Sequence, residues 1–202
     1  MTAAAYEGRD AEQITPAATA KPLKIISGGQ TGVDRAALDV ALGHGFECGG
    51  WCPAGRLDEF GKIPDQYPVQ ELQGGGFSER TLQNVKDSDG TVVIYPGELR
   101  AGTEQTVRFC VDLKRPHQLI DAPSVSAEGA AKRIADFVRE NKIGILNVAG
   151  PRQSEWAEGY DYASRALNAF LNTTRNAALL PDRAAQRSRP GSAPRTNKLR
   201  RR

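Results

Sequence analysis

The sequence predicts a single α/β domain, with a mainly parallel sheet covered by helices on both faces. Between residues 23 and 174, short apolar runs alternate with segments whose apolar residues recur at helical spacing. One run, TVVIY at residues 91–95, is rich in β-branched residues throughout, which is typical of a strand buried on both faces. Several runs end in glycine-containing turns. This order of elements favours right-handed crossovers and a doubly wound, Rossmann-like topology.

Five strands are expected in this domain, each an apolar run next to a turn signal. They are residues 25–26, 46–51, 91–95, 117–120 and 143–148. The third lies between the turn-forming pairs Asp89-Gly90 and Pro96-Gly97. Residues 67–72 form a further short extended piece. The stretch at residues 53–64, with two prolines, glycines and basic side chains, is expected to be a binding loop.

Five helices are expected between and after these strands, from apolar stripes and capping residues. The first begins at Val33 and ends at Gly43 or Gly45, and the second covers residues 79–87. The third starts at Gly102-Thr103. Either Ser124 or Ser126 caps the fourth helix. The last helix buries a stripe formed by Ala163, Ala166, Leu167, Phe170 and Leu171.

The two ends of the chain differ from this domain in composition. Residues 1–22 are small, polar and interrupted by prolines, which predicts a flexible leader. Residues 175–202 are expected to form a disordered basic tail. Residues 182–202 carry eight Lys or Arg against one Asp, and the whole chain of 202 residues has a net charge of +3. The excess positive charge therefore belongs to the tail, which argues against a folded nucleic-acid-binding surface.

Several classes of protein are disfavoured by the sequence. No apolar stretch approaches the roughly 20 residues of a membrane-spanning helix. The first residues lack the basic start and apolar centre of a secretory signal. Three cysteines form no disulfide framework and no paired zinc-binding motif, and only two histidines are present, so we expect no metal site. These features predict a cytoplasmic protein.

The turn after the first strand, GGQTG at residues 28–32, predicts an anion-binding site. Its glycines let the backbone turn sharply and approach a ligand, and the N–H groups of the following helix face the same point. The spacing is that of neither the dinucleotide motif G-x-G-x-x-G nor the P-loop. The residues expected to bind a phosphate or another anion are Gly28, Gly29, Gln30, Thr31 and Gly32. The alternative is a glycine turn with a purely structural role.

Two more turns follow predicted strands, at residues 96–103 and 150–151. Parallel strands bring such turns to one edge of the sheet, where α/β proteins bind ligands. We therefore expect four more residues to belong to the site, namely Gly102, Thr103, Gly150 and Ser154. The hydroxyl groups of Thr31, Thr103 and Ser154 could equally cap helices without binding a ligand.

Five cationic side chains are expected around the same crevice, where they would attract a highly anionic small molecule. They are Arg35, Arg56, Lys62, Arg80 and Arg152. Arg80 is the first choice, with an exposed helix arginine as the alternative. Arg35 either reaches the ligand or pairs with Asp39 at i+4. If the five cations scatter over the surface, this prediction fails.

Three other side chains are candidates for contacts with the ring of such a ligand. Trp51 either stacks on a planar ring or belongs to the core. Asp34 and Glu155 could accept hydrogen bonds from ring N–H groups of a pterin or purine.

Four stretches together resemble the molybdenum cofactor carrier family, in the SLOG group of the lysine-decarboxylase-like superfamily. They are SGGQTGVDRAALD at residues 27–39, GWCPAGR at 50–56, RTLQNVKDSDGT at 80–91 and NVAGPRQS at 147–154. The resemblance covers about 150 residues. It implies a Rossmann-like fold, a homo-oligomer and binding of molybdenum cofactor (molybdopterin), a pterin with a terminal phosphate, without chemical turnover. Molybdoenzymes would then be the recipients of the cofactor.

One stretch is also similar to the cytokinin-activating phosphoribohydrolases of the same group. These enzymes have an arginine motif, a strand and a P-G-G-x-G-T-x-x-E loop, which correspond here to SERT at residues 78–81, the strand at 91–95, and Gly102-Thr103. The loop departs from the pattern, and the position of the catalytic glutamate is Thr106. The sequence therefore favours a carrier. The alternatives are a nucleoside-monophosphate phosphoribohydrolase and a nucleotide-sensing protein, both with a nucleotide as ligand.

Overall fold

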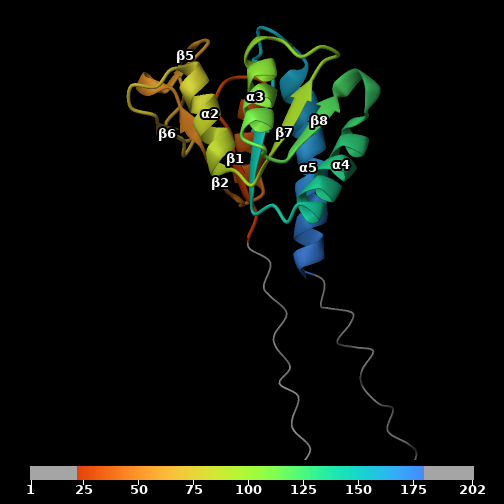
Figure 1. Cartoon of the computed structure of the whole chain (residues 1–202). Coiled ribbons are helices and arrows are strands. Elements are labelled where there is room, and N and C mark those ends of the chain that lie inside the picture. Colours follow the sequence, from red (N-terminus) through yellow and green to blue (C-terminus); the bar gives the residue numbers. More distant parts are fainter. Residues whose placement is uncertain (1–21, 180–202) are drawn as a thin grey trace, which may run out of the picture.

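The structure is a computed structural model, and it describes residues 22–179. A central sheet of five parallel strands forms its middle layer, in the order β2-β1-β9-β7-β8. These strands are β1 (Lys24–Ile26), β2 (Glu47–Gly49), β7 (Gly90–Tyr95), β8 (His117–Asp121) and β9 (Ile145–Ala149). The predicted α/β fold with a parallel, Rossmann-like sheet is therefore confirmed (Figure 1).

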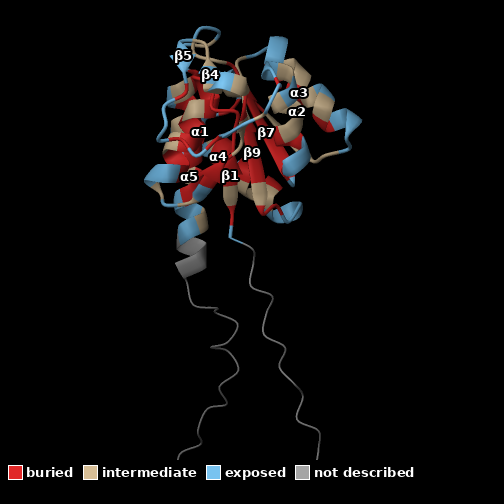
Figure 2. Ribbon diagram, turned by 90° about the vertical axis from the view of Figure 1, so that its left-hand side faces the viewer, coloured by how far each residue is buried: buried red, intermediate tan, exposed pale blue. Residues whose placement is uncertain are grey.

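Helices cover both faces of this sheet, as Figure 2 shows from the side. The helices are α1 (Val33–Gly43), α2 (Phe77–Asp87), α3 (Ala101–Asp112), α4 (Ala127–Glu140) and α5 (Gly159–Leu179). Helices α1, α4 and α5 pack together on one face, and α2 and α3 pack together on the other. No described helix is long and apolar enough to cross a membrane.

Local sequence signals explain most of these elements. Strand β7 is buried from Gly90 to Ile94, as expected for a β-branched run in a sheet with helices on both faces. Of the two predicted caps for α4, the structure has Ser126, whose Oγ accepts a hydrogen bond from Gly129 N at 3.1 Å. Helix α2 begins two residues earlier than predicted, at Phe77, and Gly76 N donates to Glu79 Oε2 at 3.0 Å.

The predicted second strand is interrupted. Gly50, with φ +121°, separates β2 from β3 (Trp51–Cys52), which pairs instead with β6 (Gln70–Glu71) in a separate two-stranded sheet. A Cβ at Gly50 would lie 2.2 Å from Ser27 O, so the chain passes too close to the end of β1 for a regular strand to continue. Asn84 fixes this crossing, because its side-chain amide bonds both Trp51 N and Trp51 O.

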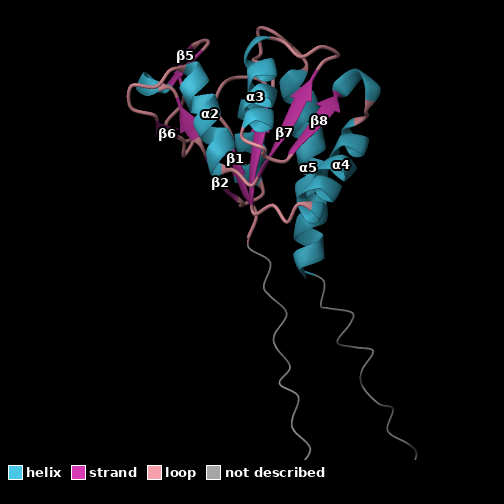
Figure 3. Cartoon of the chain, in the orientation of Figure 1, coloured by secondary structure: helices cyan, strands magenta, loops and turns pink. Residues whose placement is uncertain are grey.

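The predicted loop at residues 53–64 has more structure than expected. It contains the 3₁₀ turn η1 (Ala54–Arg56) and the antiparallel hairpin β4 (Leu57–Asp58) and β5 (Gly61–Lys62). Figure 3 shows β5 and β6 outside the central sheet. A second 3₁₀ turn, η2 (Ala122–Ser124), precedes α4.

Both predicted boundaries of the domain lie near the ends of the described residues. Helix α5 continues to Leu179, beyond the boundary expected at residue 174. The leader predicted for residues 1–22 and the tail predicted for residues 175–202 lie almost entirely outside the described residues.

Candidate functional site

A small cavity of about 80 Å³ lies at the carboxyl edge of the central sheet, beneath the first turns of α2 and α3. The chain passes from β1 to its outer neighbour β2, and from β7 to its outer neighbour β8, so these two connections run in opposite directions on either side of β9. The cavity lies at this topological switch point, where doubly wound sheets bind ligands. Eight predicted residues line it. Six were expected to bind the anion, namely Gln30, Arg80, Gly102, Thr103, Gly150 and Arg152, and two were expected to contact the ring of the ligand, namely Asp34 and Glu155. Three separate turns therefore converge here, as the sequence predicts.

Arg80 enters the cavity from α2 and pairs with a buried carboxylate. Its Nη1 lies 3.2 Å from Asp34 Oδ2, and the two side chains are 13% and 3% exposed. Burial raises the pKa of Asp34, while the adjacent Arg80 guanidinium acts in the opposite direction. The Nε of Arg80 is buried and has no hydrogen-bond partner among the described residues.

Gly28 makes room for this arginine. A Cβ at Gly28 would lie 1.5 Å from Arg80 Nη1 and 2.2 Å from Cζ, so any side chain there would overlap the guanidinium. The first glycine of the predicted turn therefore lies behind the arginine, outside the lining of the cavity.

The opposite side of the cavity holds a second ion pair. Arg152 Nε lies 3.0 Å from Glu155 Oε1, at 41% and 36% side-chain exposure. Both residues follow the turn after β9 and line the cavity. Each of the two cations of the cavity is therefore matched by a carboxylate.

The first turn of α3 closes a third side. Thr103 and Thr106 are buried and line the cavity. Thr106 Oγ1 donates to Gly102 O at 2.9 Å, so this hydroxyl is used within the helix. A helix N-terminus carries partial positive charge, which favours an anion at this place.

Two of the predicted hydroxyl donors bind a carboxylate of the chain itself. Glu59, at the tip of the β4–β5 hairpin, accepts hydrogen bonds from Thr31 Oγ1 and Ser154 Oγ, and from Ser154 N at 3.2 Å. Its backbone N–H donates to Gln30 Oε1 at 2.9 Å. Burial alone would raise the pKa of Glu59, but the donors from Ser154 and Thr31 outweigh it and lower that pKa. Neither Thr31 nor Ser154 lines the cavity.

Arg35 is placed neither at the cavity nor against Asp39, the two alternatives that the sequence left open. It pairs with Asp58 at 2.8 Å, donates to Gly29 O at 3.1 Å and lies 4.6 Å from the centre of the Tyr67 ring. Asp39 instead accepts hydrogen bonds from the hydroxyl groups of Tyr67 and Tyr160. Helix α1 directs Arg35 towards the hairpin, away from α2.

Arg56 and Lys62 also lie away from the cavity. The guanidinium of Arg56 donates to four backbone carbonyls within the loop, those of Ile63, Pro64, Tyr67 and Val69. These carbonyls lack strand partners, and a guanidinium has enough donors to satisfy several of them. Lys62 is 62% exposed and pairs with Asp65 at 3.1 Å. Of the five predicted cations, the structure brings only Arg80 and Arg152 together.

The remaining glycines of the first turn help to join the turns. The chain around Gly32 packs on the turn after β9, since Val33 N donates to Pro151 O at 3.3 Å and Gln153 N to Thr31 Oγ1 at 3.0 Å. Neither Gly29 nor Gly32 lines the cavity. A Cβ at Gly32 would lie 2.6 Å from Pro151 O, so this glycine allows the two turns to approach closely.

Five lining residues were not predicted as ligand contacts, namely Phe77, Thr81, Gln105, Thr106 and Ala149. Helical spacing could have found three of them, because Phe77 and Thr81 share a face with Arg80, and Gln105 follows Gly102 by three residues. Trp51 lies outside the cavity, and its Nε1 donates to Asp87 Oδ2 at 2.7 Å. In the described part of the chain, no group of three or more His, Cys, Asp or Glu side chains could hold a metal ion.

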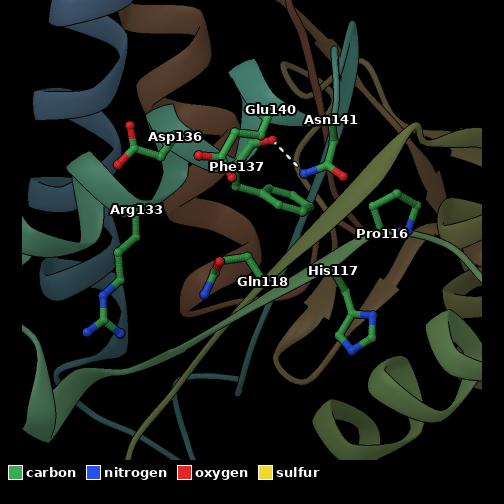
Figure 4. Close-up of a pocket in the computed structure, with 8 residues that line it drawn as sticks. All are labelled: Pro116, His117, Gln118, Arg133, Asp136, Phe137, Glu140 and Asn141. Atoms are coloured by element: carbon green, nitrogen blue, oxygen red, sulfur yellow. Dashed lines mark hydrogen bonds between the residues drawn. The ribbon is translucent and has the colours of Figure 1, made fainter.

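A larger hollow of about 440 Å³ lies elsewhere, between the start of β8 and the second half of α4 (Figure 4). Two of its charged side chains, Asp136 and Glu140, lie 2.7 and 3.7 Å from Arg139. None of the predicted site residues lines it. It also lies at the amino end of its strand, whereas doubly wound sheets bind ligands at the carboxyl ends. The smaller cavity is therefore the better candidate.

Comparisons with known proteins agree with the predicted resemblance. The model of the circularly permutated YpsA SLOG family matches residues 25–171. A crystal structure from Syntrophus aciditrophicus SB, described as a putative molybdenum carrier protein, is 45% identical, with a TM-score of 0.73. The match covers 75% of this chain and 97% of that one. The comparison with curated proteins gave no match. The chain belongs to the circularly permutated YpsA SLOG family.

Proposed function

We propose that the chain binds molybdenum cofactor at the small cavity lined by Arg80, called the Arg80 cavity below, and carries the cofactor without chemical turnover. The observation that carries this proposal is the position of Arg80, which faces the first turn of α3 at the carboxyl edge of the sheet. A phosphate between them would meet a guanidinium on one side and helix N–H groups on the other. The description of the 45% identical structure as a molybdenum carrier supports the choice of ligand.

The size of the cavity supports binding of one end of such a ligand. Its volume of about 80 Å³ is far below the roughly 300–1,000 Å³ of sites that enclose whole small molecules. The terminal phosphate would fit inside, and the pterin would lie at the opening. There, the half-exposed ring of Phe77 offers a stacking surface, and Glu155 can accept hydrogen bonds from ring N–H groups.

The proposal needs no protein ligand to molybdenum. The cavity lining contains no histidine or cysteine. The phosphate and the ring would supply the binding energy, and the metal would remain on the pterin as cargo.

The second candidate function is hydrolysis of a nucleoside monophosphate. It is favoured by one observation, that two carboxyl groups, Asp34 and Glu155, line the cavity. A glycosidic hydrolase needs a carboxyl group for acid or base catalysis. Thr106, at the position of the glutamate in the related enzymes, supplies none. Release of adenine from AMP by the native chain, and its loss in Arg80→Ala, would establish this second function.

Several predictions about partners and location belong to the same proposal. A homo-oligomer, transfer of the cofactor to molybdoenzymes and a cytoplasmic location all stay predictions. A nucleotide remains the alternative ligand.

Titration of the purified full-length chain with molybdenum cofactor tests the proposed function. We expect saturable binding of one cofactor per chain, and a loss of affinity of at least tenfold in Arg80→Ala, equivalent to about 1.4 kcal/mol or more. A matched control is Arg108→Ala, because Arg108 lies on α3 at 72% exposure and, within residues 22–179, has Glu104 as its one ion-pair partner. Binding of AMP in preference to the cofactor, or equal cofactor binding by Arg80→Ala, would disprove the proposal.

A further inference from the structure

The Arg80 cavity carries no excess positive charge, although its proposed ligand is an anion. Arg80 is paired with Asp34, and Arg152 with Glu155. An entering phosphate therefore meets two carboxylates as well as two cations. Binding must change the state of at least one of these pairs, because unscreened like charges repel strongly at short range.

The two carboxylates differ in what they can do. Glu155 is 36% exposed, so its side chain can turn into solvent and stay ionised. Asp34 is 3% exposed and lies in the first turn of α1, close to Gly28 and Arg80. It lies on the buried side of α1, so it cannot turn out into solvent as Glu155 can. If Arg80 turned to a ligand, an ionised Asp34 would be a buried charge without a partner, which is strongly destabilising.

The surroundings of Asp34 provide no replacement cation. Arg80 of α2 is its only ion-pair partner among the described residues, and Ser27 and Gln30 of the preceding turn offer neutral groups. Across the cavity, Arg152 is already bound to Glu155. Burial raises the pKa of Asp34, and removal of Arg80 from its side would act in the same direction. Protonation is the remaining way to neutralise it.

Arg80 has donors to offer a ligand. Only its Nη1 binds Asp34, and its buried Nε has no acceptor within the described residues. A buried donor without an acceptor costs free energy, which an incoming oxygen atom would recover. A tetrahedral anion can accept hydrogen bonds from two nitrogens of one guanidinium at once. In this structure Asp34 accepts from only one nitrogen of Arg80.

We propose that Asp34 is a specificity-determining residue of this site, which holds Arg80 until a tetrahedral oxyanion replaces it and then takes up one proton from solvent. The proposal rests on the proposed function, since it concerns the same cavity. The Arg80 Nη1 hydrogen bond passes from Asp34 to an oxygen of the anion, and Asp34 becomes a neutral carboxylic acid. The site thus selects ligands that can take over Arg80 completely, and it binds each of them together with a proton.

Calorimetric titration of the full-length chain with sulfate tests this proposal. Sulfate is a tetrahedral dianion that does not titrate between pH 5 and 9, so any proton taken up comes from the protein side. Measurements in two buffers with different enthalpies of ionisation give the number of protons bound with each sulfate. Arg80→Ala gives the sulfate that binds elsewhere on the chain, which is subtracted.

We expect uptake of about one proton per sulfate at pH values where Asp34 is ionised before binding, and affinity that falls by up to about tenfold per pH unit there. Asp34→Asn should bind sulfate more tightly at high pH, without proton uptake. The matched control is Asp58→Asn, because Asp58 is also a buried carboxylate, 6% exposed and paired with Arg35, but lies outside the cavity. This variant should keep the pH dependence.

Three results would overturn the proposal. They are binding of sulfate to the native chain without proton uptake, an unchanged pH dependence in Asp34→Asn, and no specific binding of sulfate. The first and third results need only the native chain and the Arg80→Ala background, so they do not depend on the folding of Asp34→Asn. If molybdenum cofactor binds in the separate titration, the proposed function stands in each of these cases.

Discussion

The guanidinium of Arg80 occupies the space where a side chain at Gly28 would project. A Cβ at Gly28 would lie 1.5 Å from Arg80 Nη1 and 2.8 Å from Asp34 Oδ2. The glycine-rich turn and the arginine of α2 thus form one unit, although 52 positions separate them in the sequence. The turn contributes to the candidate site because its Gly28 leaves room for Arg80 beside Asp34.

The first prediction follows from this contact. Gly28→Ala should displace Arg80 from Asp34 and lower the free energy of unfolding by about 1 to 3 kcal/mol, because the added methyl group has no space. Affinity for molybdenum cofactor should fall by the same factor as is expected for Arg80→Ala. Urea unfolding and cofactor titration measure the two effects.

Gly43→Ala is the control for this substitution. A Cβ at Gly43, at the end of α1, meets nothing within 4 Å. Stability and ligand binding should therefore match or exceed those of the native chain. A Gly28→Ala protein with unchanged cofactor affinity would contradict the assigned role of the contact.

The second prediction concerns Glu59, which joins the hairpin to the turns. Glu59→Gln should lower the free energy of unfolding at pH 7 by about 1 to 3 kcal/mol, since an amide cannot accept from all the Thr31 and Ser154 donors. Burial opposes ionisation of Glu59, but its hydrogen bonds prevail and lower its pKa below the ordinary 4.5. The stabilisation is therefore present above pH 4.5 and lost as the pH falls through the lowered pKa.

Urea unfolding of the two proteins between pH 3 and 7 tests this sign. The difference between native and Glu59→Gln chains should shrink towards acid. Glu47→Gln is the control, because Glu47 pairs with Lys24 on the surface at 66% exposure and such pairs contribute about 1 kcal/mol or less. A difference that grows towards acid would show that Glu59 is not held as an anion.

The third prediction separates Arg56 from the ligand. Arg56→Ala should lower the free energy of unfolding by about 2 to 4 kcal/mol, because four carbonyls lose a charged donor. Arg56→Lys should restore only part of this, since an ammonium group lacks the planar fork. Cofactor affinity, measured below the unfolding transition, should change less than threefold. A larger loss of cofactor affinity than in Arg80→Ala would show that Arg56 belongs to the binding site.

The sequence predicts the central sheet well, because its signals are local. The β-branched run of β7 follows from a few neighbouring residues, and the same kind of signal limits the cap of α4 to Ser124 or Ser126, of which the structure has Ser126. Gly102 and Gly150 could be grouped from the sequence as well, since parallel strands bring their following turns to one edge. Arg80 lies in α2, before β7, and was expected at the site because its motif resembles that of the related enzymes.

Other features depend on contacts between distant segments, which no local pattern contains. The break at Gly50 is caused by the close approach of Ser27 O. Arg35 and Arg56 resemble anion-binding residues in sequence, but the loop at residues 53–69 supplies carboxylate and carbonyl acceptors for both. Glu59 lies far in sequence from Ser154, so its contact with the turns was not predicted. The Arg80–Asp34 ion pair of the cavity likewise joins two distant segments of the chain.

Mass spectrometry of the small molecules that co-purify with the full-length chain tests whether this chain carries molybdenum cofactor. We expect the native protein to retain the pterin of molybdenum cofactor in near-stoichiometric amount, and Arg80→Ala, folded and purified in the same way, to lose it. A nucleotide retained in place of the pterin, or equal amounts of pterin in the two proteins, would contradict this expectation.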